Sequence, residues 1–263
     1  MTTATSEPLR QDGGRATTTP AVRVDRVTKA FGDQRVLDDV SFEVAAGHGF
    51  VILGRSGTGK SVTLRHIIGL IKPDSGRVFV QDDEVSVLRG RELSRVRRSI
   101  GFLFQNAALF DSISVGENVA FPLRRHTRYG DGEIRRRVTE KLEAVGLERE
   151  YRKMPADLSG GMRKRAGLAR AMALDPPILL VDEPSAGLDP ITADEIDNLL
   201  LALKKESRTT IVIVTHNMSS ARRLADELVM LHDGRIVARG TVEDLDRSDD
   251  PLVRAFMASQ HAG

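Results

Sequence analysis

Eight consecutive residues, Gly-Arg-Ser-Gly-Thr-Gly-Lys-Ser at positions 54–61, match the pattern G-x-x-x-x-G-K-[ST] in full. They follow an apolar run at 50–53 that predicts a buried strand, and they precede a helix-compatible segment at 62–69. In this setting backbone N–H groups bind phosphate, the lysine neutralises the β and γ oxygens, and the hydroxyl ligates Mg²⁺. The pattern predicts a nucleotide site. Its contact residues are Gly54, Arg55, Ser56, Gly57, Thr58, Gly59, Lys60, Ser61 and Val62, with Ser61 also on the metal.

A second glycine-rich turn, Leu-Ser-Gly-Gly-Met at 158–162, precedes its own helix-compatible segment. Ser159, Gly160 and Gly161 offer another set of backbone N–H donors for phosphate oxygens. The two turns do not readily converge on one nucleotide within a single chain. Together they predict a dimer with two shared nucleotide sites.

Polar residues end three further apolar runs. Asp182 and Glu183 follow the run at 178–181, where Asp182 is placed to hold Mg²⁺, directly or through water, and Glu183 to polarise an attacking water. His216 follows the run at 211–214 and is a candidate to hold the γ-phosphate or that water, although a structural histidine is the alternative. Gln105 ends the stretch at 100–104, where its amide reaches either Mg²⁺ or water, or simply caps a strand.

Aromatic and basic residues leave two questions open. Phe31, between two predicted strands, either stacks on a nucleobase or belongs to the core. Two arginine-rich clusters, at 124–128 and 135–137, are solvated helix faces or are attracted to an anionic membrane leaflet.

The composition of the chain excludes several classes of function. The 263 residues contain no cysteine, which rules out disulfides, thiolate zinc sites and a cysteine nucleophile. The net charge of +2 gives no global field for nucleic acid. The apolar runs are far shorter than the ~20 residues that span a bilayer, and no signal peptide is visible. We therefore expect a cytoplasmic protein that meets a membrane only through a partner.

The fold class follows from the spacing of strands and helices. Alternating apolar residues from Val22 and again at 36–44 predict two antiparallel strands. The apolar runs at 50–53, 178–181 and 211–214 are each followed by a helical segment, which predicts a parallel α/β sheet. Ligands of such sheets collect at the carboxyl ends of the strands, where the polar residues above fall.

The chain divides into three predicted regions. Residues 1–20 have no periodicity and predict a disordered tail, followed by a folded domain at 21–245. Within it, helical spacing replaces buried strands and predicts an inserted helical subdomain at about 105–175. Asp233-Gly234 predicts a hairpin. Asp250-Pro251 predicts the start of a short helix in a tail at 246–263, whose residues Leu252, Val253, Phe256 and Met257 pack either on a neighbouring subunit or on the chain's own domain.

In order and spacing, these motifs resemble those of the ATP-binding cassette (ABC) ATPases over about residues 21–240. The resemblance implies a P-loop fold with a mixed sheet core, an N-terminal antiparallel β-subdomain and a helical subdomain. It makes Phe31 the adenine-stacking residue, Gln105 the Q-loop, Ser159 to Gly161 the signature, Asp189 the D-loop and His216 the switch histidine. It also implies ATP and Mg²⁺ as ligands, Glu183 as general base, a head-to-tail homodimer and a membrane permease as partner.

A finer resemblance concerns the cargo. Met162 stands where many importers have glutamine, and together with the segments at 101–110 and 117–123 it is similar to the ATPases of Mla-type phospholipid transport. This implies an Mce-domain lipid-binding partner, an accessory subunit and a place on the cytoplasmic face of the bacterial inner membrane. Another cargo, such as amino acids or lipoproteins, is the main alternative. A DNA-repair or translation ATPase would need a long coiled coil or a second cassette, and neither is visible; a non-hydrolysing module is opposed by Glu183 and His216.

Overall fold

The computed structural model describes residues 19–258, so the tail predicted at 1–20 lies almost wholly outside the described residues. The centre of the fold is a six-stranded sheet made of β3 (Gly49–Leu53), β6 (Ile100–Leu103), β7 (Ile178–Asp182), β8 (Thr210–Thr215), β9 (Glu227–His232) and β10 (Arg235–Gly240). Its order is β10-β9-β3-β8-β7-β6. The pairs β3–β8, β7–β8, β6–β7 and β3–β9 are parallel, which confirms the parallel arrangement predicted for the runs at 50–53, 178–181 and 211–214. The pair β9–β10 is antiparallel, which confirms the hairpin at Asp233-Gly234.

A second, antiparallel sheet contains β1 (Val22–Phe31), β2 (Gln34–Val44), β4 (Ser75–Val80) and β5 (Asp83–Glu84), in the order β2-β1-β4-β5. The prediction of two antiparallel strands near the N-terminus is confirmed. The first strand is longer than predicted, because Phe31 is its last residue and pairs with Gln34 across the turn. The α/β fold with a mixed sheet and a separate antiparallel sheet is thus the predicted class.

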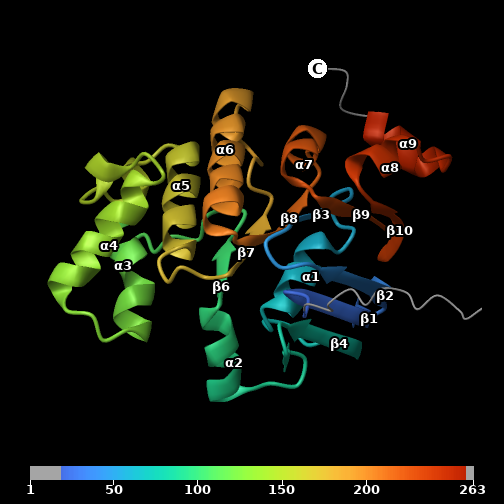
Figure 1. Ribbon diagram of the computed structural model, residues 1–263, viewed down its shortest axis with the longest axis horizontal. Helices are drawn as coiled ribbons and strands as arrows, with labels where there is room; N and C mark the ends of the chain where they lie inside the picture. The colour runs from blue at the N-terminus through green and yellow to red at the C-terminus, as the bar shows by residue number, and fades with distance from the viewer. Residues whose placement is uncertain (1–18, 259–263) are drawn as a thin grey trace, which may run out of the picture.

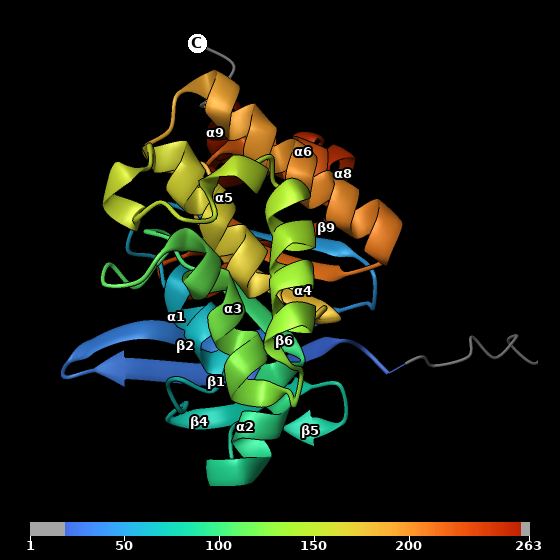
Figure 2. The ribbon, with the colours of Figure 1, turned by 90° about the vertical axis from the view of Figure 1, so that its left-hand side faces the viewer.

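The helices are α1 (Lys60–Ile67), α2 (Gly90–Arg98), α3 (Val115–His126), α4 (Asp131–Glu143), α5 (Gly160–Ala171), α6 (Pro190–Ser207), α7 (Met218–Leu224), α8 (Val242–Asp246) and α9 (Pro251–Ala258). Two 3₁₀ turns, η1 (Glu148–Glu150) and η2 (Pro155–Asp157), lie between α4 and α5. Figure 1 shows α3 and α4, in green, beyond the β6 edge of the large sheet. Figure 2 shows the antiparallel strands β1, β2 and β4 on the opposite side of α1 from α6.

Every residue of β3, β6, β7 and β8 is buried, so both faces of the large sheet are covered along these strands, which explains their continuous apolar runs. In β3, Val51 and Leu53 pack into one hydrophobic core with residues of α5, α6 and α7. Phe50 and Ile52, on the other face, pack into a second core shared with the antiparallel sheet. The rings of Phe42 and Phe50 stack with their centroids 5.0 Å apart and join the two sheets. The strand ends are thereby held rigidly where the chemistry is predicted.

The helical region between β6 and β7 has its own apolar face. Ile134, Val138 and Leu142 are all buried along α4, as their helical spacing predicts. They belong to the same core as buried residues of α3 and α5, so the region packs continuously onto the sheet. The limits predicted for a helical subdomain, about 105–175, remain a prediction.

Helix α9 closes the described part of the chain. Val253 and Met257 are buried in the chain's own core, and Leu252 and Phe256 pack against it partly buried. Asp250 accepts a hydrogen bond from the Leu252 N–H at 2.7 Å and so precedes the helix as a cap. In the structure, α9 therefore packs on the chain's own domain, which is one of the two predicted alternatives. Across residues 19–258, no helix combines the length and the apolarity that crossing a bilayer requires.

Candidate active site

Four segments that are far apart in the sequence meet at one edge of the large sheet. The strands β3, β8, β7 and β6 are neighbours and parallel, so their carboxyl ends deliver the loop at 54–61, His216, Asp182-Glu183 and Gln105 to the same side. A cavity of about 230 Å³ opens there. It is lined by residues of the glycine-rich loop together with Val36, Gln105, Glu183 and His216. The predicted convergence of the loop at 54–61, Asp182-Glu183 and His216 is confirmed in geometry, and Gln105 joins them; the role of each residue remains a prediction.

The glycine-rich loop has the backbone shape of an anion cradle. Gly57 and Gly59 have φ angles of +84° and +100°, which residues with a side chain rarely adopt. A Cβ on Gly59 would lie 2.7 Å from the carbonyl oxygen of Val36, so no other residue fits there. Gly59 is also the cap of α1, whose first N–H groups have no partner within the helix. The loop therefore fits a phosphate group.

Lys60 is held inside this loop. Its side chain is only 5% exposed, and Nζ donates to the carbonyl oxygens of Gly54 at 2.7 Å and Arg55 at 3.0 Å. Nζ also lies 3.3 Å from Oε1 of Glu183. The buried charge is thus satisfied by its own loop and by a carboxylate. A phosphate entering the cavity would replace that carboxylate as the partner of the ammonium.

The oxygen atoms beside Lys60 are suitable ligands for a hard cation such as Mg²⁺. Ser61 Oγ donates a 2.7 Å hydrogen bond to Oδ1 of Asp182, so the two predicted metal ligands already touch. Asp182 is 6% exposed, and burial raises the pKa of its carboxyl, while the Ser61 hydrogen bond opposes that rise. Gln105 is exposed and lines the same cavity. A hydroxyl, a carboxylate and an amide oxygen are ligands that Mg²⁺ accepts, with water and phosphate completing its shell.

Glu183 sits in an unusual backbone conformation. Its φ angle is +46°, although it is not glycine, and its side chain is only 9% exposed. Oε2 lies 2.9 Å from Nδ1 of His216, and the N–H of Glu183 donates to the Val214 carbonyl at 2.9 Å. A strained residue held by several contacts is typical of functional sites. The carboxylate is thereby aimed into the cavity between Lys60 and His216.

The second glycine-rich turn lies outside this cavity. Ser159 caps α5 by accepting the N–H of Met162 at 3.2 Å, and Asp189 caps α6 by accepting the N–H groups of Ile191 and Thr192. The first turns of α5 and α6 are packed together, since Gly161 lies against the Thr192 side chain. No residue of 158–162 lines the cavity at the glycine-rich loop. The two glycine-rich turns therefore lie on separate surfaces of one chain; that each of them faces phosphate remains a prediction.

Gly161→Ala tests this packing. A Cβ at position 161 would lie 2.3 Å from Cγ2 of Thr192, so either the Thr192 side chain, which is hydrogen-bonded to Asp189, or one of the two helices must shift. An alanine normally stabilises a helix relative to glycine, but overpacking costs about 1–3 kcal/mol, so we expect a net loss of stability. Thermal unfolding of G161A, T192A and the double variant measures it. We expect the double variant to recover most of the loss; equal stability of G161A and the parent chain contradicts the packing argument.

Phe31 is not a core residue. Its side chain is 48% exposed, with Nζ of Lys29 5.4 Å from the ring centroid. Lys29 is itself bonded to Asp74 at 2.5 Å. The alternative of a core aromatic is therefore wrong. Phe31 does not line the cavity at the loop, so its stacking on adenine remains a prediction.

The arginine-rich clusters are partly paired with carboxylates. Arg124 pairs with Glu117 and Asp131, and Arg136 pairs with Glu133 and Glu140. The arginines lower the pKa of Glu133 to about 2. At 135–137 this pairing favours a solvated helix face over attraction to an anionic leaflet. At 124–128 only Arg124 is paired within the described residues, and both alternatives stay open there.

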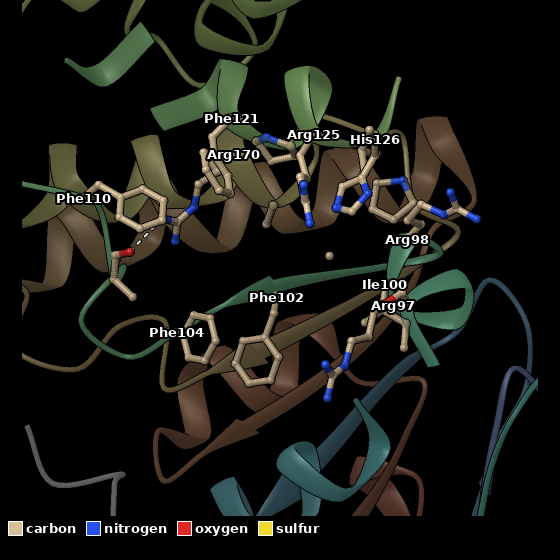
Figure 3. A pocket seen from close by; sticks show the side chains of 17 residues that line it. Arg97, Arg98, Ile100, Phe102, Phe104, Phe110, Phe121, Arg125, His126 and Arg170 are labelled. Carbon is tan, nitrogen blue, oxygen red and sulfur yellow. Dashed lines mark hydrogen bonds between the residues drawn. The ribbon is translucent and has the colours of Figure 1, made fainter. Parts of the chain in front are cut away.

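A larger concavity, of about 550 Å³, is lined by Phe104 and Ala108, on either side of Gln105 in the sequence. Figure 3 shows Phe102, Phe104, Phe110 and Phe121 along it, with Arg98, Arg125 and His126 together at one end. The rings of Phe102 and Phe104 stack at 4.1 Å between centroids. Arg98 and Arg125 form no ion pair with a carboxylate within the described residues. Burial, together with the charges of these two arginines, lowers the pKa of His126. We call this surface the aromatic groove.

Sequence reasoning missed the residue that shapes the aromatic groove. Asn118 is fully buried; its amide donates to the carbonyls of Phe110, Ile113 and Ser114 and accepts the N–H of Phe110 at 2.8 Å. These bonds fix the loop that follows Gln105. An asparagine inside an apolar helix was the available signal, since buried amides need partners.

Comparison with known proteins agrees with this geometry. The family model described as ABC transporter matches residues 37–186. Over 243 residues the chain is 44% identical to the probable ribonucleotide transport ATP-binding protein mkl of Mycobacterium leprae, covering 92% of this chain and 70% of that one. Over 242 residues it is 39% identical to the intermembrane phospholipid transport system ATP-binding protein MlaF of Haemophilus influenzae, covering 92% of each chain.

Solved structures show the same fold. The dimeric ATP-binding cassette MJ0796, bound to ADP and Pi in a post-hydrolysis state, superposes with a TM-score of 0.79 at 36% identity. The match covers 84% of this chain and 98% of that one. With the family model spanning more than half of the chain, these matches show that the protein belongs to the ABC transporter family and is an ATPase that couples ATP hydrolysis to transport.

Proposed function

We propose that this protein is the ATPase subunit of a phospholipid transporter and works as a head-to-tail homodimer beneath a membrane permease. The observation that carries the dimer is the separation of the two phosphate-facing surfaces within one chain. In a head-to-tail pair, the turn at 158–162 of one subunit faces the glycine-rich loop of the other. The relative MJ0796 is a dimer bound to ADP and Pi, which supports this arrangement.

The proposed reaction is the attack of water on the γ-phosphate of ATP, which breaks the bond between the γ-phosphorus and the β-phosphate oxygen and releases ADP and inorganic phosphate. Glu183 accepts the proton of that water, and His216, 2.9 Å from its carboxylate, keeps it oriented. Lys60 leaves its ion pair with Glu183 to bind the phosphate oxygens, which frees the carboxylate to act. Ser61, Asp182 and Gln105 are placed to hold Mg²⁺, which supplies neutralisation of the developing phosphate charge. The dimer partner contributes Ser159 to Gly161 and Asp189.

The permease docks, in this proposal, in the aromatic groove. The groove is adjacent to Gln105, so an occupant there contacts the loop that touches the ATP cavity. Phe110 and Phe121 are 45% and 47% exposed and their rings are 4.9 Å apart, so they offer apolar surface in need of cover. Arg98, Arg125 and His126 favour a carboxylate in the same occupant. A short cytoplasmic helix with apolar residues and one acidic residue fits both features.

The phospholipid cargo is supported by the similarity to MlaF, which covers 92% of both chains. By the same similarity we propose an Mce-domain lipid-binding protein and an accessory subunit as further partners, at the cytoplasmic face of the inner membrane. The alternative cargo class is amino acids, because the chain is also 42% identical, over 218 residues, to the methionine import ATP-binding protein MetN of Caulobacter vibrioides.

Purification of the assembled complex from native membranes in detergent separates these cargoes. We expect a permease and an Mce-domain protein to co-elute with the chain, together with phospholipid detected by mass spectrometry of the extract. An amino-acid-binding protein in place of both contradicts the lipid proposal. Arg125→Glu tests the groove in the same experiment: we expect at least a tenfold loss of co-eluting permease, because the carboxylate partner is repelled. Arg128→Glu makes the same charge change outside the groove, and a matching loss there contradicts the docking site.

A further inference from the structure

Lys164 is a buried cation that the proposed reaction does not use. It lies in α5 and is 5% exposed, whereas most lysines of a folded protein are solvated. Burial lowers the pKa of its ammonium to about 8, and the nearby carboxylates of Glu183 and Asp182 only partly oppose that shift. Burying a lysine without a partner is costly, so its contacts identify what it stabilises.

Those contacts lead to the proposed general base. Nζ of Lys164 donates to the backbone carbonyl oxygen of Glu183 at 2.9 Å and to that of Pro184 at 2.7 Å. Ala186 N–H also reaches the Glu183 carbonyl, at 3.2 Å, so this segment is a tight turn held from outside by the ammonium. Lys164 therefore grips the backbone of Glu183, while Lys60 and His216 contact its carboxylate.

The hydrogen bonds from Lys164 are important because the backbone of Glu183 is strained. Its φ of +46° is a conformation that costs a residue with a side chain on the order of 1–3 kcal/mol. On its N-terminal side the strain is held by the hydrogen bond from the Glu183 N–H to the Val214 carbonyl at 2.9 Å. On its C-terminal side it is held by Lys164. A relaxation of this turn would rotate the carboxylate away from the cavity.

Lys164 also connects two different sites. It lies four residues after Gly160 on the same helix, about 6 Å along its axis, and α5 begins at the turn that faces the dimer partner. A rigid helix transmits a shift of its first turn to Lys164 and, through the two carbonyls, to Glu183. Lys164 thus connects the turn at 158–162, which is proposed to contact the ATP of the partner subunit, to Glu183, the proposed base for the ATP of its own chain.

We propose that Lys164 is a positioning residue for Glu183, which fixes the strained turn at the end of β7 and links it to the turn at the start of α5. The proposal rests on the proposed role of Glu183 as the base. It predicts a specific defect: ATP binds normally, because the glycine-rich loop is untouched, but the misplaced carboxylate slows hydrolysis. Small displacements of catalytic groups cost about 10- to 100-fold in rate.

The test compares Lys164→Met, Lys164→Gln and Glu183→Gln in the full chain, with Lys205→Met as a matched control on the exposed side of α6. We expect K164M to lose about 10- to 100-fold in kcat with KM for ATP within about threefold of the parent. K164Q, whose amide can still donate hydrogen bonds, should recover part of the rate, and K205M should match the parent.

Each outcome bears on one proposal. Parental kcat in K164M, beside an inactive E183Q, overturns the role of Lys164 and leaves Glu183 as base. Parental activity in E183Q instead overturns the base itself. If K164M does not fold, K164Q decides: reduced kcat at unchanged KM supports positioning, whereas parental kcat, or a parallel loss of ATP affinity, shows a merely structural role and overturns the proposal.

Discussion

Glu183→Gln should reduce ATP hydrolysis by about 10²- to 10⁴-fold while leaving ATP binding intact. The magnitude is that of general-base assistance, which an amide cannot provide because it does not accept the proton. The amide keeps the shape of the side chain and can still accept a hydrogen bond from His216, so the cavity should be preserved. Phosphate release measures the rate, and nucleotide titration measures affinity. We also expect size-exclusion chromatography with ATP to show a longer-lived dimer, because hydrolysis no longer opens it.

Glu148→Gln is the control for this variant. Glu148 is exposed in η1 and is remote from the cavity lining, so the same chemical change there should leave the rate unaltered. Hydrolysis by E183Q at the parental rate would rule out Glu183 as the base. A loss of ATP binding that matches the loss of rate would instead point to a collapsed cavity.

Lys60→Met should abolish hydrolysis and weaken ATP binding by about 10- to 100-fold. The estimate takes one charge-assisted hydrogen bond to phosphate as about 1.5–3 kcal/mol. The variant also leaves the Gly54 and Arg55 carbonyls without their buried donor, and it leaves Glu183 without its cation. Methionine retains the length of the side chain, so the change isolates the charge and the donors.

Titration with a fluorescent ATP analogue measures this loss of affinity, and Lys205→Met provides the comparison, since it removes an exposed lysine from α6. We expect K205M to bind and hydrolyse ATP as the parent does. Parental affinity in K60M contradicts the assignment of Lys60 to phosphate, because the loop would then bind the nucleotide through its backbone alone.

The sequence predicts the parts of this site that depend on local pattern. The strands β3, β7 and β8 are buried on both faces, so each is a continuous apolar run that can be recognised without a structure. The glycine-rich loop needs glycines for its positive φ angles, which makes it equally visible. By contrast, α2 buries only Val96 and β4 leaves its first three residues exposed, so neither carries a strong apolar signal, and neither was predicted.

The features that escaped prediction depend on contacts between distant segments. In the sequence, Lys164 is one of several basic residues on a predicted helix. It is buried because the backbone that follows β7 packs against its side chain. The left-handed backbone of Glu183 is likewise invisible in a sequence, since glutamate has no preference for it. Both result from tertiary packing that joins residues 164, 183 and 214.

The ion pair between Lys60 and Glu183 has a consequence for the timing of ATP hydrolysis. Oε1 of Glu183, the proposed base, lies 3.3 Å from the buried ammonium of Lys60, so its carboxylate is engaged in an ion pair. The same ammonium is the one that the phosphates require. In the proposed reaction, binding of the phosphates to Lys60 and release of the Glu183 carboxylate are one event, so the base becomes free to accept a proton only in a subunit whose ATP is bound.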